Sequence, residues 1–464
     1  MLLIRWNAAD FTTLLKNNLV SLSIAIAKEQ LPRTFSDAIE LARKLGVNYI
    51  WIDSLCVVQD DEGDRRREKS LMEHVYGGSY LNIAASSATS VHGGCWLKSS
   101  NTSGGMRVKV RVGNDELLRE IRDDRCYDRA IWNSHLATRA WALQEKLLPP
   151  RTIHLGDRGA FWECRARIAS EFLPDGFAQK IRSGLLQRTR EPHLLKSWWA
   201  DVVRLYTSAE LSSEQDKLPA LSGLVRRIQN EKGGQYLAGL WRDERLEAQL
   251  CWKITEPRPR PKCWRAPTWS WASVDSAVVY MPTQPGICDN QYAHVIDARV
   301  HPLGDDPFGE LSGGFLRIAC AGIIPGRLAT RDTILVQSMD AEYEFRVLLD
   351  SLDENCPLEG DNTYLLPIIG GVQGTGILEA GQWYEPQVVK GMLLRRTGAK
   401  IGEFCRVGSF ECSQPLEPRV CGLDLFHQFF EVFERLGKEV ASQRCAEVIE
   451  NTVHHMECFV INVV

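Results

Sequence analysis

The first third of this sequence alternates between helix and strand patterns, and that alternation limits the fold more than any other feature. Residues 31–46 carry apolar side chains at helical spacing and end at a glycine. Residues 47–52 and 80–84 are short apolar runs typical of buried strands, and the charged segment at about 64–76 has a helical pattern. Helices that alternate with short buried strands predict an α/β domain with a parallel-sheet core.

This alternation continues to about residue 165. A helical pattern over 135–148 is followed by a hairpin pattern around Gly156–Gly159. Later segments read differently, with helical patterns first, strand patterns after them, a helix over 424–448 and a final strand over 458–464. We therefore predict three regions, an α/β domain over 1–165, a helical connecting region over 166–275 that includes helices at 194–205, 218–228 and 238–252, and a β-rich region with terminal helices over 276–464.

Composition excludes several classes of protein. Lys and Arg number 55 and Asp and Glu 59, a net charge of −4, so nothing favours nucleic acid or an anionic membrane as partner. No run approaches the roughly 18 apolar residues of a membrane span, and the apolar start is too short for a signal peptide. The 14 cysteines are scattered without a CxxC pair, which predicts free thiols, no metal site and a cytoplasmic location.

The strongest local constellation is the stretch from Trp51 to Asp60. Its apolar beginning leads into polar residues at the carboxyl end of a predicted strand, where ligands bind in open α/β sheets. Asp53 is equally compatible with a catalytic carboxylate and with a helix cap, and Cys56 is better interpreted as structural than as a nucleophile. The polar residues of this stretch are Asp53, Ser54, Cys56, Gln59 and Asp60.

A second constellation lies on the predicted helix at 135–148. Trp141, Gln144 and Glu145 are three and four residues apart and share a helix face, where the indole could stack on a planar ligand. Arg139 could pair with a carboxylate or a phosphate. Residue types alone favour a packed helix with a paired Glu145. On the nearby hairpin, strand alternation predicts that Glu163 faces solvent, opposite Trp162.

Taken together and in this order, six blocks resemble the fungal heterokaryon-incompatibility domain. The resemblance covers about the first third of the chain, and the remainder is similar to the region that often follows this domain. One departure stands at Asn7, where the family has glycine, and it predicts a short first strand and raises the alternative of a truncated, inactive paralogue. The blocks are Leu31–Ile39, Trp51–Asp60, Glu68–Tyr76, Tyr80–Ala85, Arg139–Leu148 and Trp162–Cys164.

The resemblance implies non-self recognition and programmed cell death, with protein partners and self-association. The family is similar to flavodoxin-like Toll/interleukin-1 receptor (TIR) domains, some of which hydrolyse NAD with a catalytic glutamate. That analogy makes Glu145 and Asp53 candidate catalytic residues and NAD a candidate substrate, with no cofactor. Residues that would bind the ligand are Ser54, Cys56, Gln59, Asp60, Arg139, Trp141 and Gln144. A cleft where the charged residues converge would favour an enzyme, and a filled interior would favour a signalling module.

Overall fold

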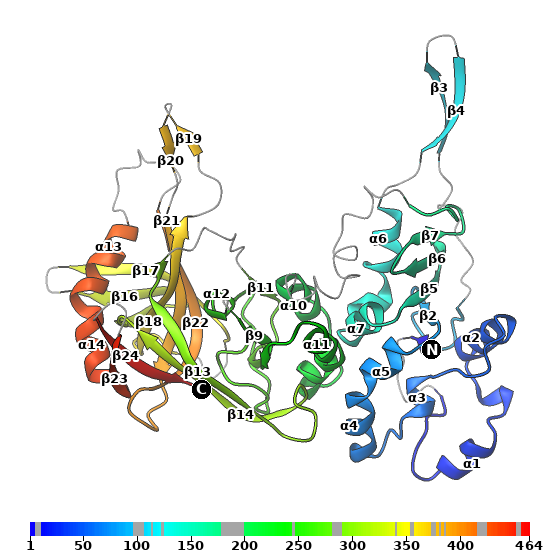
Figure 1. Ribbon diagram of the computed structural model, residues 1–464, viewed down its shortest axis with the longest axis horizontal. Helices are drawn as coiled ribbons and strands as arrows, with labels where there is room; N and C mark the ends of the chain where they lie inside the picture. Colours follow the sequence, from blue (N-terminus) through cyan, green and yellow to red (C-terminus); the bar gives the residue numbers. More distant parts are fainter. Residues whose placement is uncertain are drawn as a thin grey trace. The chain divides into compact units, whose positions relative to one another are not determined.

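The chain folds into two compact units, residues 1–232 and 233–464, and each unit is considered by itself. The predicted boundaries at 165 and 275 stay a prediction. The structure, a computed structural model (Figure 1), describes residues 1–4, 11–95, 106–112, 115–121, 125–177, 199–243, 246–280, 290–338, 341–352, 357–372, 377–379, 382–384, 387–414, 425–451 and 456–464.

A five-stranded mixed sheet forms the centre of the first unit. The first three strands run parallel and the last three form antiparallel pairs, so the predicted parallel pairing and hairpin are confirmed. The flavodoxin-like or TIR-like layout stays a prediction. In sheet order the strands are β1 (Leu2–Leu3), β2 (Asn82–Ala85), β5 (Arg151–Gly156), β6 (Gly159–Cys164) and β7 (Ile168–Ser170).

Several helices follow the predicted pattern. The helix predicted over 31–46 is α2 (Arg33–Lys44), and Gly46 just beyond it takes the left-handed φ of +70° expected at a helix end. The segment predicted over 64–76 is two helices that meet at Leu71. The remaining elements up to residue 147 are α1 (Leu19–Ile24), η2 (Lys28–Gln30), α3 (Asp53–Cys56), α4 (Glu62–Ser70), α5 (Met72–Gly77), the hairpin β3 (Met106–Val112) and β4 (Asp115–Ile121), α6 (Cys126–Ile131), η4 (His135–Thr138) and α7 (Trp141–Leu147).

The strand predicted over 47–52 is wrong. The segment is extended, but among the described residues one backbone hydrogen bond, from the Leu2 N–H to the Trp51 oxygen (3.0 Å), connects it to β1. Its apolar character has another cause, because Ile52 is buried and Ile50 partly buried against the core shared by α2 and the sheet. Hydrophobic burial without a ladder of hydrogen bonds therefore produced the strand-like pattern.

The two faces of the sheet differ in chemistry. Ile83 and Leu155 belong to an apolar cluster that also contains Phe35 of α2. On the neighbouring strands β2 and β5, the alternate residues Asn82 and His154 are also buried but polar. Because side chains alternate along a strand, these polar groups lie on the opposite face. A buried polar layer therefore separates that face from α7 and α6, and it contains most of the site described below.

The first unit ends with three further elements, which confirm the helical patterns at 194–205 and 218–228 over their described residues. They are α10 (Trp199–Thr207), η6 (Glu214–Lys217) and α11 (Pro219–Lys232). Helix α11 packs against α4, α5 and α7. The connecting region therefore contributes to the fold of the N-terminal unit.

The helix predicted over 238–252 is wrong in its first half. A hairpin, β8 (Gln235–Leu237) and β9 (Leu240–Arg242), turns through Ala238 and Gly239, which have φ values of +46° and +104°. Two consecutive positive φ values suit a tight hairpin turn and cannot belong to a right-handed helix. Only α12 (Leu246–Leu250) is helical here.

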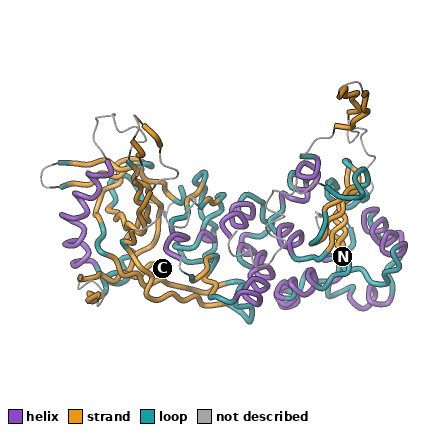
Figure 2. Tube along the Cα trace, turned by 45° about the horizontal axis from the view of Figure 1, so that its top comes forward, coloured by secondary structure: helices purple, strands orange, loops and turns teal. Residues whose placement is uncertain are grey.

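Six antiparallel strands of the second unit close into a barrel. Each strand pairs with its two neighbours, and the last pairs again with the first. Every strand contributes to one buried apolar cluster, which is completed by Phe429 and Val432 of α13 (Leu425–Val432) and by Phe433, the residue that follows this helix. Figure 2 shows this group of strands in orange beside a helical segment in purple. Around the barrel the strands are β15 (Ile324–Thr330), β16 (Thr333–Gln337), β17 (Glu342–Leu349), β22 (Glu403–Ser413), β21 (Gln387–Arg396) and β18 (Asn362–Val372).

The sheet continues beyond the barrel, where β24 pairs in parallel with β22. The predicted β-rich C-terminal region and final strand are thus confirmed, and the helical pattern at 424–448 is interrupted by a π-helical turn. The other elements of this unit are β10 (Lys253–Ile254), η7 (Trp271–Ser273), β11 (Val278–Val279), β12 (Asn290–Gln291), β13 (Ala293–Pro302), β14 (Leu311–Cys320), β19 (Ile377–Glu379), β20 (Gln382–Tyr384), α13 (Leu425–Val432), η8 (Phe433–Gly437), α14 (Lys438–Arg444), β23 (Glu447–Asn451) and β24 (Met456–Val463).

Candidate functional site

The loop after Ile52 holds three predicted site residues in structural contacts. Asp53 begins α3, and its Oδ1 accepts the backbone N–H of Ser54 at 2.8 Å. Gln59 donates through Nε2 to two carbonyl oxygens of the same loop, at 2.9 and 3.2 Å. Asp60 is exposed, and its Oδ1 accepts the backbone N–H of Lys16 at 2.8 Å. Gln59 and Asp60 therefore shape the loop and connect it to the segment near Lys16.

Ser54 and Cys56 lie on the same turn in different environments. Ser54 is fully buried, and its Oγ has no hydrogen-bond partner among the described residues. Cys56 is exposed. Desolvation of its thiol, with the nearby Asp53 carboxylate, raises the pKa of Cys56. A nucleophilic cysteine requires the opposite shift, so this environment does not activate the thiol.

Helix α7 carries the second predicted constellation. Arg139 precedes it and donates from Nη1 to the Ile4 carbonyl oxygen at 2.7 Å. Trp141 donates from its indole N–H to Asp216 Oδ2 at 3.1 Å. Gln144 is fully buried, and neither its amide nitrogen nor its amide oxygen has a partner among the described residues. Polar side chains of this helix are thus directed inward.

Glu145 is the most perturbed of the predicted catalytic residues. Its side chain lies in the polar layer, where its Oε1 accepts the hydroxyl of Tyr76 at 3.2 Å. Its Oε2 has no hydrogen-bond partner among the described residues, and the residue is only 5% exposed. Burial raises the pKa of Glu145, the Asp53 carboxylate raises it further, and the Arg139 guanidinium opposes both. A carboxyl group in this environment favours its protonated, acid form.

Two charged side chains, one from each predicted segment, shift the pKa of both Glu145 and Tyr76. Asp53 and Arg139 both act on each of these groups, and burial with the Glu145 carboxylate raises the pKa of Tyr76 well above its ordinary value. Asp53, Arg139 and Glu145 therefore share one electrostatic neighbourhood. Sequence reasoning missed Tyr76, although it stands in a block that carries the family resemblance.

A second polar group in the same layer was also missed. His154 Nε2 lies 3.1 Å from Glu163 Oε2, which accepts the hydroxyl of Tyr127 at 2.5 Å. The prediction that Glu163 faces solvent is wrong, because Glu163 is only 8% exposed. Alternation along β6 holds, but Glu163 shares the face of buried Phe161, and its two polar partners compensate for the burial. The sequence signal that could have indicated this buried polar layer was the alternation of polar and apolar residues on the two paired strands, at Asn82 and His154.

The region after the α/β domain covers part of this layer. Asp216 of η6 accepts Lys69 Nζ at 2.5 Å as well as the Trp141 indole. Gly223 of α11 lies so close to Gln144 that an added Cβ would stand 3.0 Å from its Oε1. Trp141 and Gln144, both predicted to face a ligand, are therefore in contact with this chain's own helical region.

One pocket of this unit lies away from these residues. It has a volume of about 380 Å³ and is lined by Met1 and by residues of α2, α5, β2 and the segments beside them, including Leu45, Tyr49 and Tyr80. None of the predicted site residues lines it. Over the described residues no group of His, Cys, Asp and Glu is arranged to hold a metal ion, and no helix there is both long and apolar enough to cross a bilayer.

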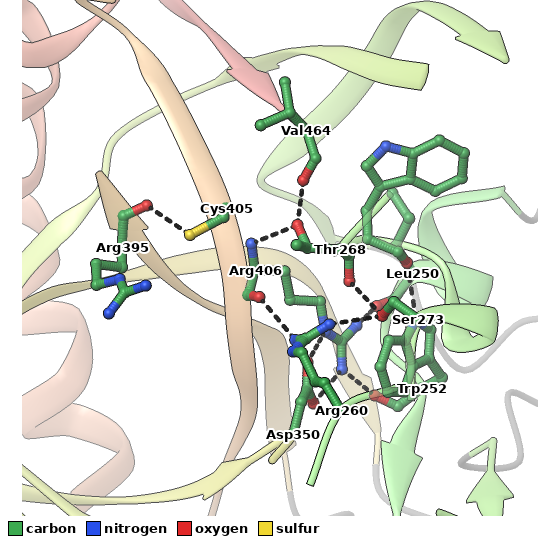
Figure 3. Close-up of polar contacts among 11 residues, drawn as sticks. Leu250, Trp252, Arg260, Thr268, Ser273, Asp350, Arg395, Cys405, Arg406 and Val464 are labelled. Atoms are coloured by element: carbon green, nitrogen blue, oxygen red, sulfur yellow. Dashed lines mark hydrogen bonds and ion pairs between the residues drawn. The ribbon is translucent and has the colours of Figure 1, made fainter. Parts of the chain in front are cut away.

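The second unit contains a buried charge of a different kind (Figure 3). Arg406 is fully buried and bonds both oxygens of Asp350, from Nε at 2.8 Å and from Nη2 at 3.2 Å. Its remaining donors reach the carbonyl oxygens of Leu250 (2.7 Å) and Trp252 (2.6 Å). The guanidinium also lies 3.4 Å from the centre of the Trp252 ring. Every nitrogen of Arg406 is thus satisfied, and the arrangement joins β22 to the segment at 250–252.

The first unit is thus an α/β domain with a parallel-containing sheet and a closed polar layer beneath α7. Residues 5–145 match the family model of heterokaryon incompatibility protein (HET). The N-terminal part of the chain, over residues 5–145, is accordingly a HET domain. No curated protein and no solved structure matches the chain. Asn7, the departure noted in the sequence, lies outside the described residues.

Proposed function

We propose that this chain acts in fungal non-self recognition, with the HET domain as a signalling module whose output is programmed cell death. In this proposal the domain works in the cytoplasm through protein partners and self-association, and it does not turn over a small molecule. The HET family match over residues 5–145 carries the proposal.

The closed state of the polar layer supports a module over an enzyme. Glu145 is 5% exposed and bonded to Tyr76, and Trp141 and Gln144 face the chain's own helical region. A hydrolase needs a cleft that admits its substrate, whereas Glu145 and Gln144 are buried among the described residues. Asp216, which holds Lys69 and Trp141 together, would couple the domain to the region that follows it.

NAD cleavage is a second candidate function, favoured by one observation. Glu145 keeps one carboxylate oxygen without a partner among the described residues while burial raises its pKa. Asp53 and Arg139 are within its electrostatic reach. A carboxyl group held in this way could act on a glycosidic bond if the layer opened, with Trp141 stacked on a planar ring. NAD would then be the substrate.

Induced expression of the full chain in a fungal host tests both functions. Viability and cellular NAD are followed together for the wild type, Glu145→Gln and Glu29→Gln, where Glu29 is an exposed residue that serves as the matched control. Immunoblots measure the amount of each variant in the cells. Thermal melting of the purified variants tests whether Glu145→Gln, an isosteric change, leaves the fold intact.

Three outcomes separate the proposals. Death without a fall in NAD, in all three proteins, is what the signalling function predicts. Death with a collapse of NAD that only Glu145→Gln abolishes would replace the module by an NAD hydrolase. Survival of cells that contain full amounts of folded wild-type chain would contradict both functions.

A further inference from the structure

A basic pocket lies on the outer face of the barrel in the second unit. It has a volume of about 180 Å³ and is formed by side chains of β17, β21 and β22 together with the stretch at Cys251 and Lys253. Three of its lining residues are cationic and one is anionic, which leaves a formal charge of +2. The polar residues of this basic pocket are Cys251, Lys253, Arg346, Lys390, Ser409 and Glu411.

Strand register explains why these residues share one face. Lys390 of β21 stands directly opposite Glu411 of β22. Ser409, two residues before Glu411, is paired with Leu348 of β17, and Arg346 lies two residues before Leu348. Residues two apart on a strand project to the same side. Because Val347 and Phe410 between them belong to the barrel's apolar cluster, the charged set projects outward.

Lys390 is the unusual member of this set. It is only 7% exposed, yet it makes no hydrogen bond or ion pair with any residue that the structure describes. Glu411, its cross-strand neighbour, lies 3.7 Å from Lys253 Nζ instead. The Lys390 ammonium is not among the described side-chain atoms that are both buried and unbonded, so it reaches the solvent of the cavity. A cation that borders a cavity without an ion-pair partner there is suited to an anion that enters from outside.

The other cations complete the setting. Arg346 is exposed at the rim, and its charge acts on Asp332, whose pKa is lowered chiefly by the hydroxyl of Thr330. Lys253 forms an ion pair with Glu411, so one positive charge of the pocket is already balanced. Lys390 and Arg346 remain as two cations, and Ser409 supplies a hydroxyl. Lysine binds phosphate as a point charge and arginine binds it through paired N–H donors.

We propose that the basic pocket binds the phosphate group of a small molecule, either inorganic phosphate or a small phosphate monoester. The formal charge of +2 over the lining residues matches the charge of a dianion. The volume of about 180 Å³ accommodates one phosphate with a short organic group and lies below the 300–1,000 Å³ of pockets for drug-sized ligands. Lys390 is the central contact, Arg346 closes the rim, and Ser409 donates its hydroxyl.

Titration of the full chain tests this site. Inorganic phosphate and glycerol 3-phosphate are added separately at constant ionic strength set with sodium chloride, and binding is measured by calorimetry and thermal melting. The variants are Lys390→Met, which keeps the aliphatic stem, and Arg346→Gln, an exposed position whose change leaves the fold intact. Lys400→Met, at an exposed turn residue outside the pocket, is the matched control.

Expected results differ sharply between the variants. Wild type and Lys400→Met bind at least one of the two probes and melt at a higher temperature in its presence, whereas Lys390→Met weakens binding by at least about tenfold. Without phosphate, Lys390→Met melts at or above the wild-type temperature, because an uncompensated charge is gone. Tighter binding of glycerol 3-phosphate identifies a monoester site, and tighter binding of inorganic phosphate identifies free phosphate as the ligand. Equal binding by wild type, Lys390→Met and Arg346→Gln, or no binding by any of them, would overturn the proposal.

Discussion

Glu145 in the first unit and Arg406 in the second are both buried charged residues, but their surroundings differ. Each guanidinium nitrogen of Arg406 donates a hydrogen bond, to both oxygens of Asp350 and to two backbone carbonyls. Glu145 has a single hydrogen bond to Tyr76 and an oxygen without a partner among the described residues. The first arrangement is what a structural ion pair requires, and the second is a perturbed group of the kind that collects at functional sites.

The difference also separates two ways of placing a charge inside a protein. The charge of Arg406 is balanced by an opposite charge at 2.8 Å, so removal of Asp350 leaves the buried guanidinium without its carboxylate, and removal of Arg406 leaves Asp350 with the longer contact to Arg260. Burial instead raises the pKa of Glu145 and so shifts its carboxyl group toward the protonated form. Four predictions test this contrast, beginning with the largest expected effect.

Arg406→Met is expected to have the largest effect on stability. The substitution removes both hydrogen bonds from Arg406 to the fully buried Asp350, which keeps only the longer ion pair with Arg260 Nη2 at 4.0 Å among the described residues. Buried pairs broken in this way lose about 3–5 kcal/mol of unfolding free energy. Urea unfolding of the full chain, followed by tryptophan fluorescence, measures the loss. Arg331→Gln, at an exposed position, is the control and should change stability by less than about 0.5 kcal/mol. Equal midpoints for the two variants would show that the ion pair does not stabilise the barrel.

Asp216→Asn tests the contact between the HET domain and the helical region after it. The variant loses the ion pair with Lys69, at 2.5 Å and largely buried, and weakens the bond from the Trp141 indole. We expect a loss of about 1–3 kcal/mol, seen as a lower melting temperature, and a smaller loss for Trp141→Phe. Asp175→Asn, on the surface, provides the control. If Asp216→Asn melts like this control, the helical region is not held through Asp216.

Glu145→Gln should change the pH dependence of stability. Because the pKa of the folded carboxyl is raised above 4.5, the folded chain binds more protons than the unfolded chain as pH rises past 4.5, and wild-type stability falls across that window. Glutamine has no such proton, so its stability relative to wild type should increase with pH, by at most about 1.4 kcal/mol per pH unit. Urea midpoints from pH 4 upward measure this, with Glu29→Gln as control. Parallel curves for wild type and Glu145→Gln would contradict the raised pKa.

His154→Gln should have the smallest effect, at the acid side of neutrality. Burial lowers the pKa of His154 below 6.5, and its bond to Glu163 opposes the shift. Below pH 6.5 His154 therefore binds a proton in the unfolded chain more readily than in the folded chain, and wild-type stability is lost as pH falls. Glutamine removes that contribution, so the variant should lose less stability between pH 6.5 and 5.5 than wild type. Exposed His301→Gln is the control, and an unchanged slope for His154→Gln would exclude the histidine as a source of acid sensitivity.

Local patterns in the sequence were sufficient where neighbouring residues decide the structure. The apolar spacing of 31–46 and its glycine define α2, and the turn residues 156–159 define the β5–β6 hairpin. Local patterns failed where contacts between distant residues decide the structure. Residues 47–52 have strand-like composition, but Ile52 is the one among them that is buried, and the segment forms no ladder. The two positive φ values at Ala238 and Gly239 break a helical pattern.

The candidate site shows the same division. Motif reading selected Asp53, Arg139 and Glu145, and the structure brings these three into one electrostatic neighbourhood. It did not select Tyr76 or His154, whose roles depend on partners 69 and 9 residues away along the chain. Nor did it indicate that Asp216 would hold the Trp141 indole.

The sequence by itself determined the family of the N-terminal domain, its alternation of helices and strands, and the residue types available to its polar layer. These follow from short-range spacing and from side-chain chemistry, which a linear pattern contains. Tertiary structure alone decided that Glu163 turns inward, that Glu145 of α7 is buried, and that Lys390 lines a cavity in which Glu411 pairs with Lys253 instead. Burial and the pairing of charges depend on which distant segments pack together, and that information exists only in three dimensions.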